Sequence, residues 1–313
     1  MQPPSRRTFL ALGLITLTTA CTGTDGTDVA TKAPTPDPDT PVRLRAVTAT
    51  DTLLAAYDAL LATPGAQTAL LQPLRAETAQ HRAALAQGLP AASETPTPST
   101  TPTATPTPAT LAALERQTAQ SHLADLDAAR PPLARLLASV AAANALHATT
   151  LGAPSDQPAP TAPPTPATPT PGPALPALQK ALSAEHAAVY GYGVVGAHLP
   201  DDQQRADART YYAAHQAQRD TWQRLLTTPT PAAGGYQLPF PVTDAPTATK
   251  LAAHLEIRLS TVYADLVADL PAPHRRTVAT ALRDCTLRAH HWGAPTAPFP
   301  GIPDPLPTPT EPH

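Results

Sequence analysis

Apolar residues recur at intervals of three and four positions through most of the chain, which is the spacing of one face of an α-helix. The stretches with this spacing are rich in alanine and leucine, and prolines separate them. No stretch has the β-branched alternation that is typical of a strand. The pattern predicts an all-α protein with eight helices, at 49–62, 66–88, 109–129, 132–151, 175–199, 202–227, 247–270 and 273–292.

The 42 prolines gather in a few tracts, and two of these, 94–108 and 158–173, are threonine-proline repeats. Such composition cannot bury a core and favours extended, solvated chain. The tracts predict this organisation: a signal peptide at 1–20, a disordered tether at 21–47, a helical unit at 48–152 with a Thr/Pro-rich insert at 90–108, a linker at 153–173, a second unit at 174–302 and a tail at 303–313. The tracts are either plain spacers or O-glycosylated stalks.

The two sets of four helices look like copies of one unit. Leu111-Ala112-Ala113 and Leu251-Ala252-Ala253 are followed at equal distances by matching Ala-Asp-Leu segments and by Pro131 and Pro271. Chance matching between alanine-rich helices is the alternative. The pattern favours duplication of a four-helix unit, and it leaves open whether the two units dock or share one core.

The first residues predict export. Ser5-Arg6-Arg7-Thr8-Phe9-Leu10 resembles the twin-arginine signal S-R-R-x-F-L, and Arg6 and Arg7 are its main recognition element. The apolar stretch that follows is too short to span a bilayer. It ends at Ala20-Cys21, which resembles a bacterial lipoprotein cleavage site, so Cys21 is expected to carry lipid. The protein would then lie on the outer face of the cell membrane; the alternative is ordinary cleavage and free secretion.

Charge and cysteine content narrow the partners. The formal net charge is −3 and no basic cluster remains outside the signal, so binding to nucleic acid is not expected. The chain has two cysteines, and lipid on Cys21 would leave Cys285 without a partner for a disulfide. The expected partners are the membrane, through the anchor, and an unknown envelope partner or small ligand. The oligomeric state is left open.

The second set of helices carries the candidate chemistry. Heptad seams place Glu185, His215, Arg219 and Glu256 inward near one level of a bundle. Unpaired buried charge is very costly, so these groups must pair with each other or hold an ion.

Three segments of this set resemble a known family. They are AEHAAVYGYGVVGAHL at 184–199, YQLPFPVTD at 236–244 and HLE at 254–256. In this order they resemble an actinobacterial family of ferritin-like domains of unknown function, over about 174–302. The resemblance implies a ferritin-like antiparallel four-helix bundle in the C-terminal half, and no known activity. The internal repeat predicts that a second, related four-helix unit precedes this domain.

Ferritin-like dimetal sites use one glutamate from each of two helices and a Glu-x-x-His from each of the other two. Glu185 and Glu256 suit the single glutamates, but Tyr212 and Leu287 stand where two further glutamates are needed. Four interpretations are open. One is a dimetal centre, one is a single iron, manganese or zinc ion, one is a metal-free network of Glu185, Arg219, His215 and Glu256, and one is a pocket for a small ligand. The single ion would be held by Glu185, His215 and Glu256, with His290 or His291.

The missing carboxylates favour the metal-free network. The leading function is therefore a cell-envelope lipoprotein that acts as a non-catalytic binding or structural module. The alternative is a metal-dependent ferritin-like oxidoreductase or a metal-storage protein. The sequence has no phosphate loop, nucleophile elbow or Cys-x-x-Cys motif.

Overall fold

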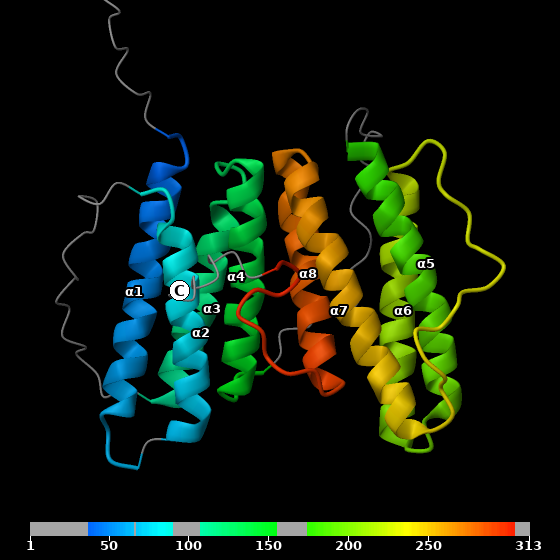
Figure 1. Cartoon of the computed structure of the whole chain (residues 1–313), viewed down its shortest axis with the longest axis horizontal. Helices are drawn as coiled ribbons and strands as arrows, with labels where there is room; N and C mark the ends of the chain where they lie inside the picture. Colours follow the sequence, from blue (N-terminus) through cyan, green and yellow to red (C-terminus); the bar gives the residue numbers. More distant parts are fainter. Residues whose placement is uncertain (1–36, 66, 90–106, 155–173, 304–313) are drawn as a thin grey trace, which may run out of the picture. The chain divides into compact units, whose positions relative to one another are not determined.

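The computed structural model describes residues 37–65, 67–89, 107–154 and 174–303, and these residues form helices without strands (Figure 1). The helices are α1 (Thr40–Leu61), α2 (Thr68–Ala86), α3 (Pro108–Ala124), α4 (Pro131–Thr150), α5 (Ala174–His198), α6 (Asp202–Arg224), α7 (Ala245–Asp269) and α8 (Ala272–His291). The all-α prediction is confirmed. None of these helices is long and apolar enough to cross a membrane.

Several predictions concern residues that the structure does not describe. Outside the described residues lie the predicted signal at 1–20 with Arg6 and Arg7, the predicted lipidation site Cys21, and most of the Thr/Pro-rich tracts.

The start of α1 differs from the prediction. Residues 40–47, expected in the tether, form its first two turns, and Val42 and Ala46 are buried. Pro41 lies in the first turn, where a proline fits because the backbone N–H there has no helical partner. The side chain of Asp39, just before the helix, accepts a hydrogen bond from the Arg130 backbone N–H at 2.9 Å. The proline therefore begins this helix, whereas the prediction took it for part of the tether.

The two sets of helices pack in the same pattern. In the first set α1 contacts α2 and α3, and α3 contacts α4; in the second set α5 contacts α6 and α7, and α7 contacts α8. The sets meet where α4 lies against α8 and α7 (Figure 1). The largest cluster of buried apolar side chains includes Leu137 of α4 together with Leu182 and Leu282 of the second set. The described residues therefore form one compact unit with a shared core.

The segment after α8 connects the two sets. Residues 294–303, which we call the strap, cross from the end of α8 onto the first set, and Phe299 is buried there. Three polar contacts hold it in place: the Ser139 hydroxyl to the Pro300 carbonyl (2.8 Å), the Thr296 hydroxyl to Glu77 (2.7 Å), and His81 Nε2 to the Pro298 carbonyl (2.6 Å). Helical periodicity does not predict these contacts.

Replacing Gly301 of the strap with alanine is expected to lower the free energy of unfolding by at least about 2 kcal/mol. Gly301 has a φ of +78°, and an added Cβ would lie 2.3 Å from the Ser260 carbonyl oxygen. The control is Gly193→Ala, since a Cβ at this position inside α5 meets no atom within 4 Å. It should stabilise by up to about 1 kcal/mol. Urea unfolding measures both, and wild-type stability of Gly301→Ala would contradict the packing of the strap.

Candidate functional site

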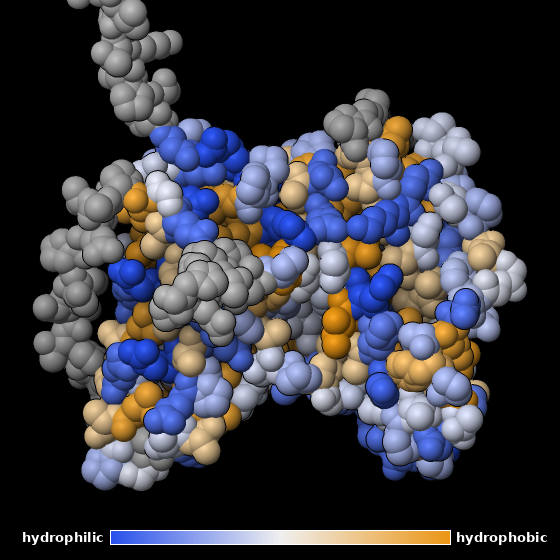
Figure 2. All heavy atoms as spheres, in the orientation of Figure 1, coloured by the Kyte–Doolittle hydropathy of each residue, from blue (hydrophilic) through white to orange (hydrophobic). Residues whose placement is uncertain are grey.

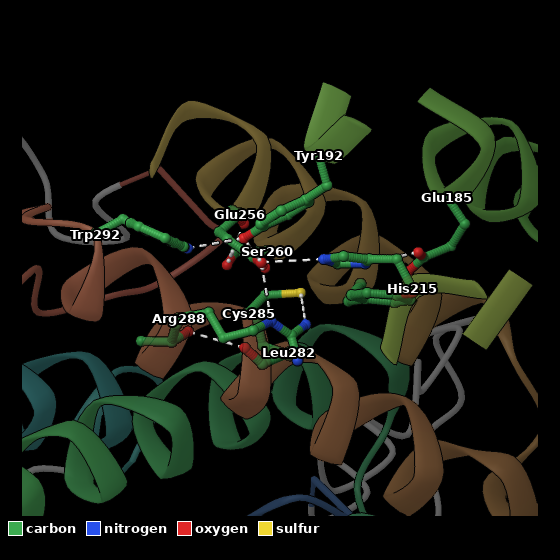
Figure 3. A network of polar contacts seen from close by, with 11 residues as sticks. Glu185, Tyr192, His215, Glu256, Ser260, Leu282, Cys285, Arg288 and Trp292 are labelled. Atoms are coloured by element: carbon green, nitrogen blue, oxygen red, sulfur yellow. Dashed lines mark hydrogen bonds and ion pairs between the residues drawn. The ribbon is translucent and has the colours of Figure 1, made fainter. Parts of the chain in front are cut away.

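Three helices of the second set bring a histidine between two glutamates. Glu185 comes from α5, His215 from α6 and Glu256 from α7, and each is at most 1% exposed. His215 Nδ1 lies 2.8 Å from Glu185 Oε2, and His215 Nε2 lies 3.0 Å from Glu256 Oε1 (Figure 3). An imidazole ring can donate from both nitrogens only when it is protonated. The geometry therefore favours an imidazolium held between two carboxylates.

The charged groups around His215 agree with an imidazolium at this position. Burial lowers the pKa of His215, but the carboxylates of Glu185 and Glu256 outweigh it and raise the pKa to about 9. Burial raises the pKa of Glu256, but the positive charges of Arg288 and His215 outweigh it and lower the pKa to about 2. At neutral pH His215 is thus a cation and Glu256 an anion.

Arg288 of α8 supplies a second cation. Its Nε donates to Glu256 Oε1 at 2.9 Å, and its guanidinium also lies 3.3 Å from the Cys285 sulfur. Burial lowers the pKa of Arg288, but Glu256 outweighs it and raises the pKa well above its usual value. Cys285 is buried, and burial raises the pKa of its thiol, which makes it a poor nucleophile. His215 and Arg288 thus bring two positive charges to the two carboxyl groups.

Aromatic side chains donate further hydrogen bonds to both glutamates, although Glu256 Oε2 is buried without a hydrogen-bond partner among the described residues. Tyr192 donates to Glu256 Oε1 at 2.6 Å, and Tyr263 donates to Glu185 Oε1. Each phenol accepts in turn from an indole: Trp292 donates to the Tyr192 hydroxyl at 3.0 Å (Figure 3), and Trp222 donates to the Tyr263 hydroxyl at 3.2 Å. We call this set the Glu-His-Glu network. Its members are Glu185, Tyr192, His215, Trp222, Glu256, Tyr263, Arg288 and Trp292.

Three of the predicted site residues lie outside this network, and the prediction that Arg219 belongs to the buried cluster is wrong. Arg219 pairs with Asp220 at 2.7 Å, and a quarter of its side chain is exposed. His290 Nδ1 lies 3.1 Å from the Ala294 carbonyl oxygen, and His291 pairs with Asp207 near the surface. On α6 the buried positions are Ala208, Tyr211, His215 and Trp222, which leaves Arg219 at the edge of the buried face.

The residues of the network do not fit a resident metal ion. Glu256 Oε1 accepts from Tyr192, His215 and Arg288, and the guanidinium places a fixed positive charge next to the carboxylate. Both nitrogens of His215 face carboxylates, so the ring has no free nitrogen directed at a metal position. Within residues 37–65, 67–89, 107–154 and 174–303, no group of three or more His, Cys, Asp or Glu side chains is arranged to hold a metal.

The first set of helices contains a similar network that sequence reasoning missed. His147 of α4 lies between Glu115 of α3, at 3.2 Å, and Glu77 of α2, at 3.0 Å. Tyr57 of α1 donates to Glu115 at 2.6 Å, as Tyr192 does to Glu256, and Asn144 donates to the other Glu115 oxygen. Burial lowers the pKa of His147, but Glu115 and Glu77 outweigh it and raise the pKa to about 9. Both halves thus place a charged histidine between two glutamates, one of which accepts from a tyrosine, although Glu77 of the first set is partly exposed.

The second set of helices is similar to a known protein family. Residues 177–304 match the family model DUF4439, a domain of unknown function. The DUF4439 match begins within α5 and runs through the strap, so it contains the whole Glu-His-Glu network. The solved structure of a conserved hypothetical protein from Mycobacterium tuberculosis is 33% identical, over 39% of this chain and 97% of that chain, with a TM-score of 0.37. No curated protein matches this chain.

Proposed function

We propose that the protein is an exported cell-envelope lipoprotein whose helical body is a non-catalytic binding or structural module. The pairing of Arg288 with Glu256 carries the second part of this proposal. Protein donors bind both oxygens of Glu185 and one oxygen of Glu256, and the three side chains at the centre are at most 1% exposed. A substrate therefore has no access to their charges. Burial of a balanced ion network serves to fix one packing of the bundle, which is a recognised use of such groups.

The same proposal includes a ferritin-like ancestry for the DUF4439 domain. In ferritin-like carboxylate proteins the metal site lies in the bundle core and takes single glutamates from two helices. Here Glu185 and Glu256 come from α5 and α7, and Arg288 supplies the positive charge that a metal ion would supply. The domain is then a ferritin-like bundle in which protein cations hold the carboxylates. The metal-dependent oxidoreductase or storage alternative ranks below it because of Arg288.

Replacing Cys21 with alanine is expected to release the protein from the membrane fraction into the medium. The reason is that stable anchoring needs lipid chains, and this cysteine is the residue that would carry them. Fractionation of cells that express the full chain, followed by immunoblotting, measures the distribution.

The control for that experiment is the pair Arg6→Lys and Arg7→Lys, which should keep the chain inside the cell because it removes the twin-arginine signal. Retention of Cys21→Ala in the membrane fraction would refute the anchor. Unchanged export of the double lysine variant would refute the export route.

A further inference from the structure

A cavity opens between the strap and the helices beneath it. Its volume is about 400 Å³, within the roughly 300–1,000 Å³ that is typical of ligand sites. Leu146 of α4, Ala289 of α8 and Phe299 of the strap are buried residues of its lining. Because α4 belongs to the first set and α8 to the second, the cavity is formed at the junction of the two sets.

The walls of this strap cavity are chemically uniform. No charged side chain lines it, and most of its lining residues are apolar. Its three hydroxyls donate to carbonyl groups one turn earlier in their own helices: Ser260 to Glu256 (3.0 Å), Thr261 to Ile257 (3.4 Å) and Thr286 to Leu282 (2.9 Å). Their protons are therefore taken. An ion would find no counter-charge here, and burial of an unpaired ion is costly.

An exposed apolar side chain marks the edge of the cavity. Among the described residues three large hydrophobic side chains are exposed, and one of them, Ile257, lines the cavity with half of its surface in solvent. Figure 2 shows hydrophobic surface on α7 between hydrophilic side chains. A chain-like apolar ligand would cover this side chain on its way in.

We propose that the strap cavity binds the hydrocarbon chain of a membrane lipid, with the lipid's polar group left outside in water. The neutral, apolar wall selects an uncharged chain, and the volume accommodates part of one. The source of the ligand rests on the proposed function, since a protein anchored at the outer face of the membrane lies next to lipid.

The first test uses the Cys21→Ala protein, purified from whichever fraction holds it, and the neutral apolar dye N-phenyl-1-naphthylamine. The wild-type cavity should bind the dye saturably, with a rise in its fluorescence, and 1-dodecanol should displace it. Ala297→Trp and Thr261→Trp, both at exposed lining positions, should each weaken binding at least about tenfold, or 1.4 kcal/mol. Ala213→Trp, exposed on α6 and away from the lining, should bind as the parent does.

Failure of the dye to bind, or equal binding by all four proteins, would overturn the cavity as a site. A second test identifies the source: the lipid that copurifies with the natively anchored protein is extracted and measured by mass spectrometry. Stoichiometric lipid that falls in Ala297→Trp supports the proposal. Dye binding with no copurifying lipid would overturn the lipid assignment. Neither result depends on where Cys21→Ala fractionates, so a failure here is distinct from failure of the anchor.

Discussion

Replacing Arg288 with methionine is expected to lower the free energy of unfolding by about 3–5 kcal/mol. The guanidinium is buried and donates to Glu256 at 2.9 Å. Without it, the network keeps two carboxylates and a single cation, and the excess negative charge has no water to stabilise it. Urea unfolding at pH 7, followed by circular dichroism, measures the difference.

The matched control is Arg283→Met, five residues earlier on the same helix. Arg283 pairs with its neighbour Asp284, and nearly a quarter of its side chain is exposed, so the change should cost less than about 1 kcal/mol. A double variant, Arg288→Met with Glu256→Gln, should recover part of the loss because it removes the unbalanced charge. Equal effects of the two single variants would show that Arg288 does not compensate a buried carboxylate.

Raising the pH from 6.5 to about 9 is expected to destabilise the protein by several kcal/mol. His215 and His147 have folded pKa values of about 9, above the unfolded value of 6.5. Their contribution is thus complete below pH 6.5 and is lost as the pH rises through 9. At about 1.4 kcal/mol per pKa unit, each contributes up to about 3 kcal/mol. Urea unfolding at a series of pH values measures the loss.

Stability should also fall on the acid side of pH 6.5. Burial lowers the pKa of His81 to about 3 and that of His122 to about 4. Below pH 6.5 these histidines therefore bind protons in the unfolded state but not in the folded state, which lowers the free energy of unfolding. The contribution of Glu256 is lost between pH 4.5 and 2. Maximum stability is expected near pH 6.5. His215→Gln should remove about half of the alkaline loss, and a free energy of unfolding that is constant from pH 6.5 to 9.5 would contradict the charged histidines.

The helices could be predicted because their apolar spacing and their prolines are local signals. Pro131 and Pro271, for example, stand at the starts of α4 and α8. The strap could not, because Pro295, Pro298 and Pro300 give it no periodicity and its contacts lie on distant helices. Its position depends on packing that only the folded chain brings together.

The three central residues of the site could also be predicted, but the cation beside them could not. Glu185, His215 and Glu256 are polar residues in otherwise apolar seams, and the structure brings them together. The choice of Arg219 as the cation failed because α8 packs on both α7 and α4, which buries positions beside its seam, including Arg288.

The register of the sequence repeat did not predict the network of the first set, because it is shifted by one residue. Aligning Leu111-Ala112-Ala113 with Leu251-Ala252-Ala253 sets Glu115 opposite Leu255, one residue away from Glu256. The contacts show the register that matters, in which Glu115 corresponds to Glu256 and His147 to Arg288. Alanine-rich helices allow such a one-residue shift because their small side chains match in several registers.

In the Glu-His-Glu network, protein cations pair with the buried carboxyl groups in place of a metal ion. This pairing is tested most directly by the metal content and melting temperature of the protein from its native host, before and after chelation. We expect less than stoichiometric metal and an unchanged melting temperature after chelation. Stoichiometric iron, manganese or zinc that is lost in Glu185→Ala, with a lower melting temperature after chelation, would contradict it and favour the metal-dependent alternative.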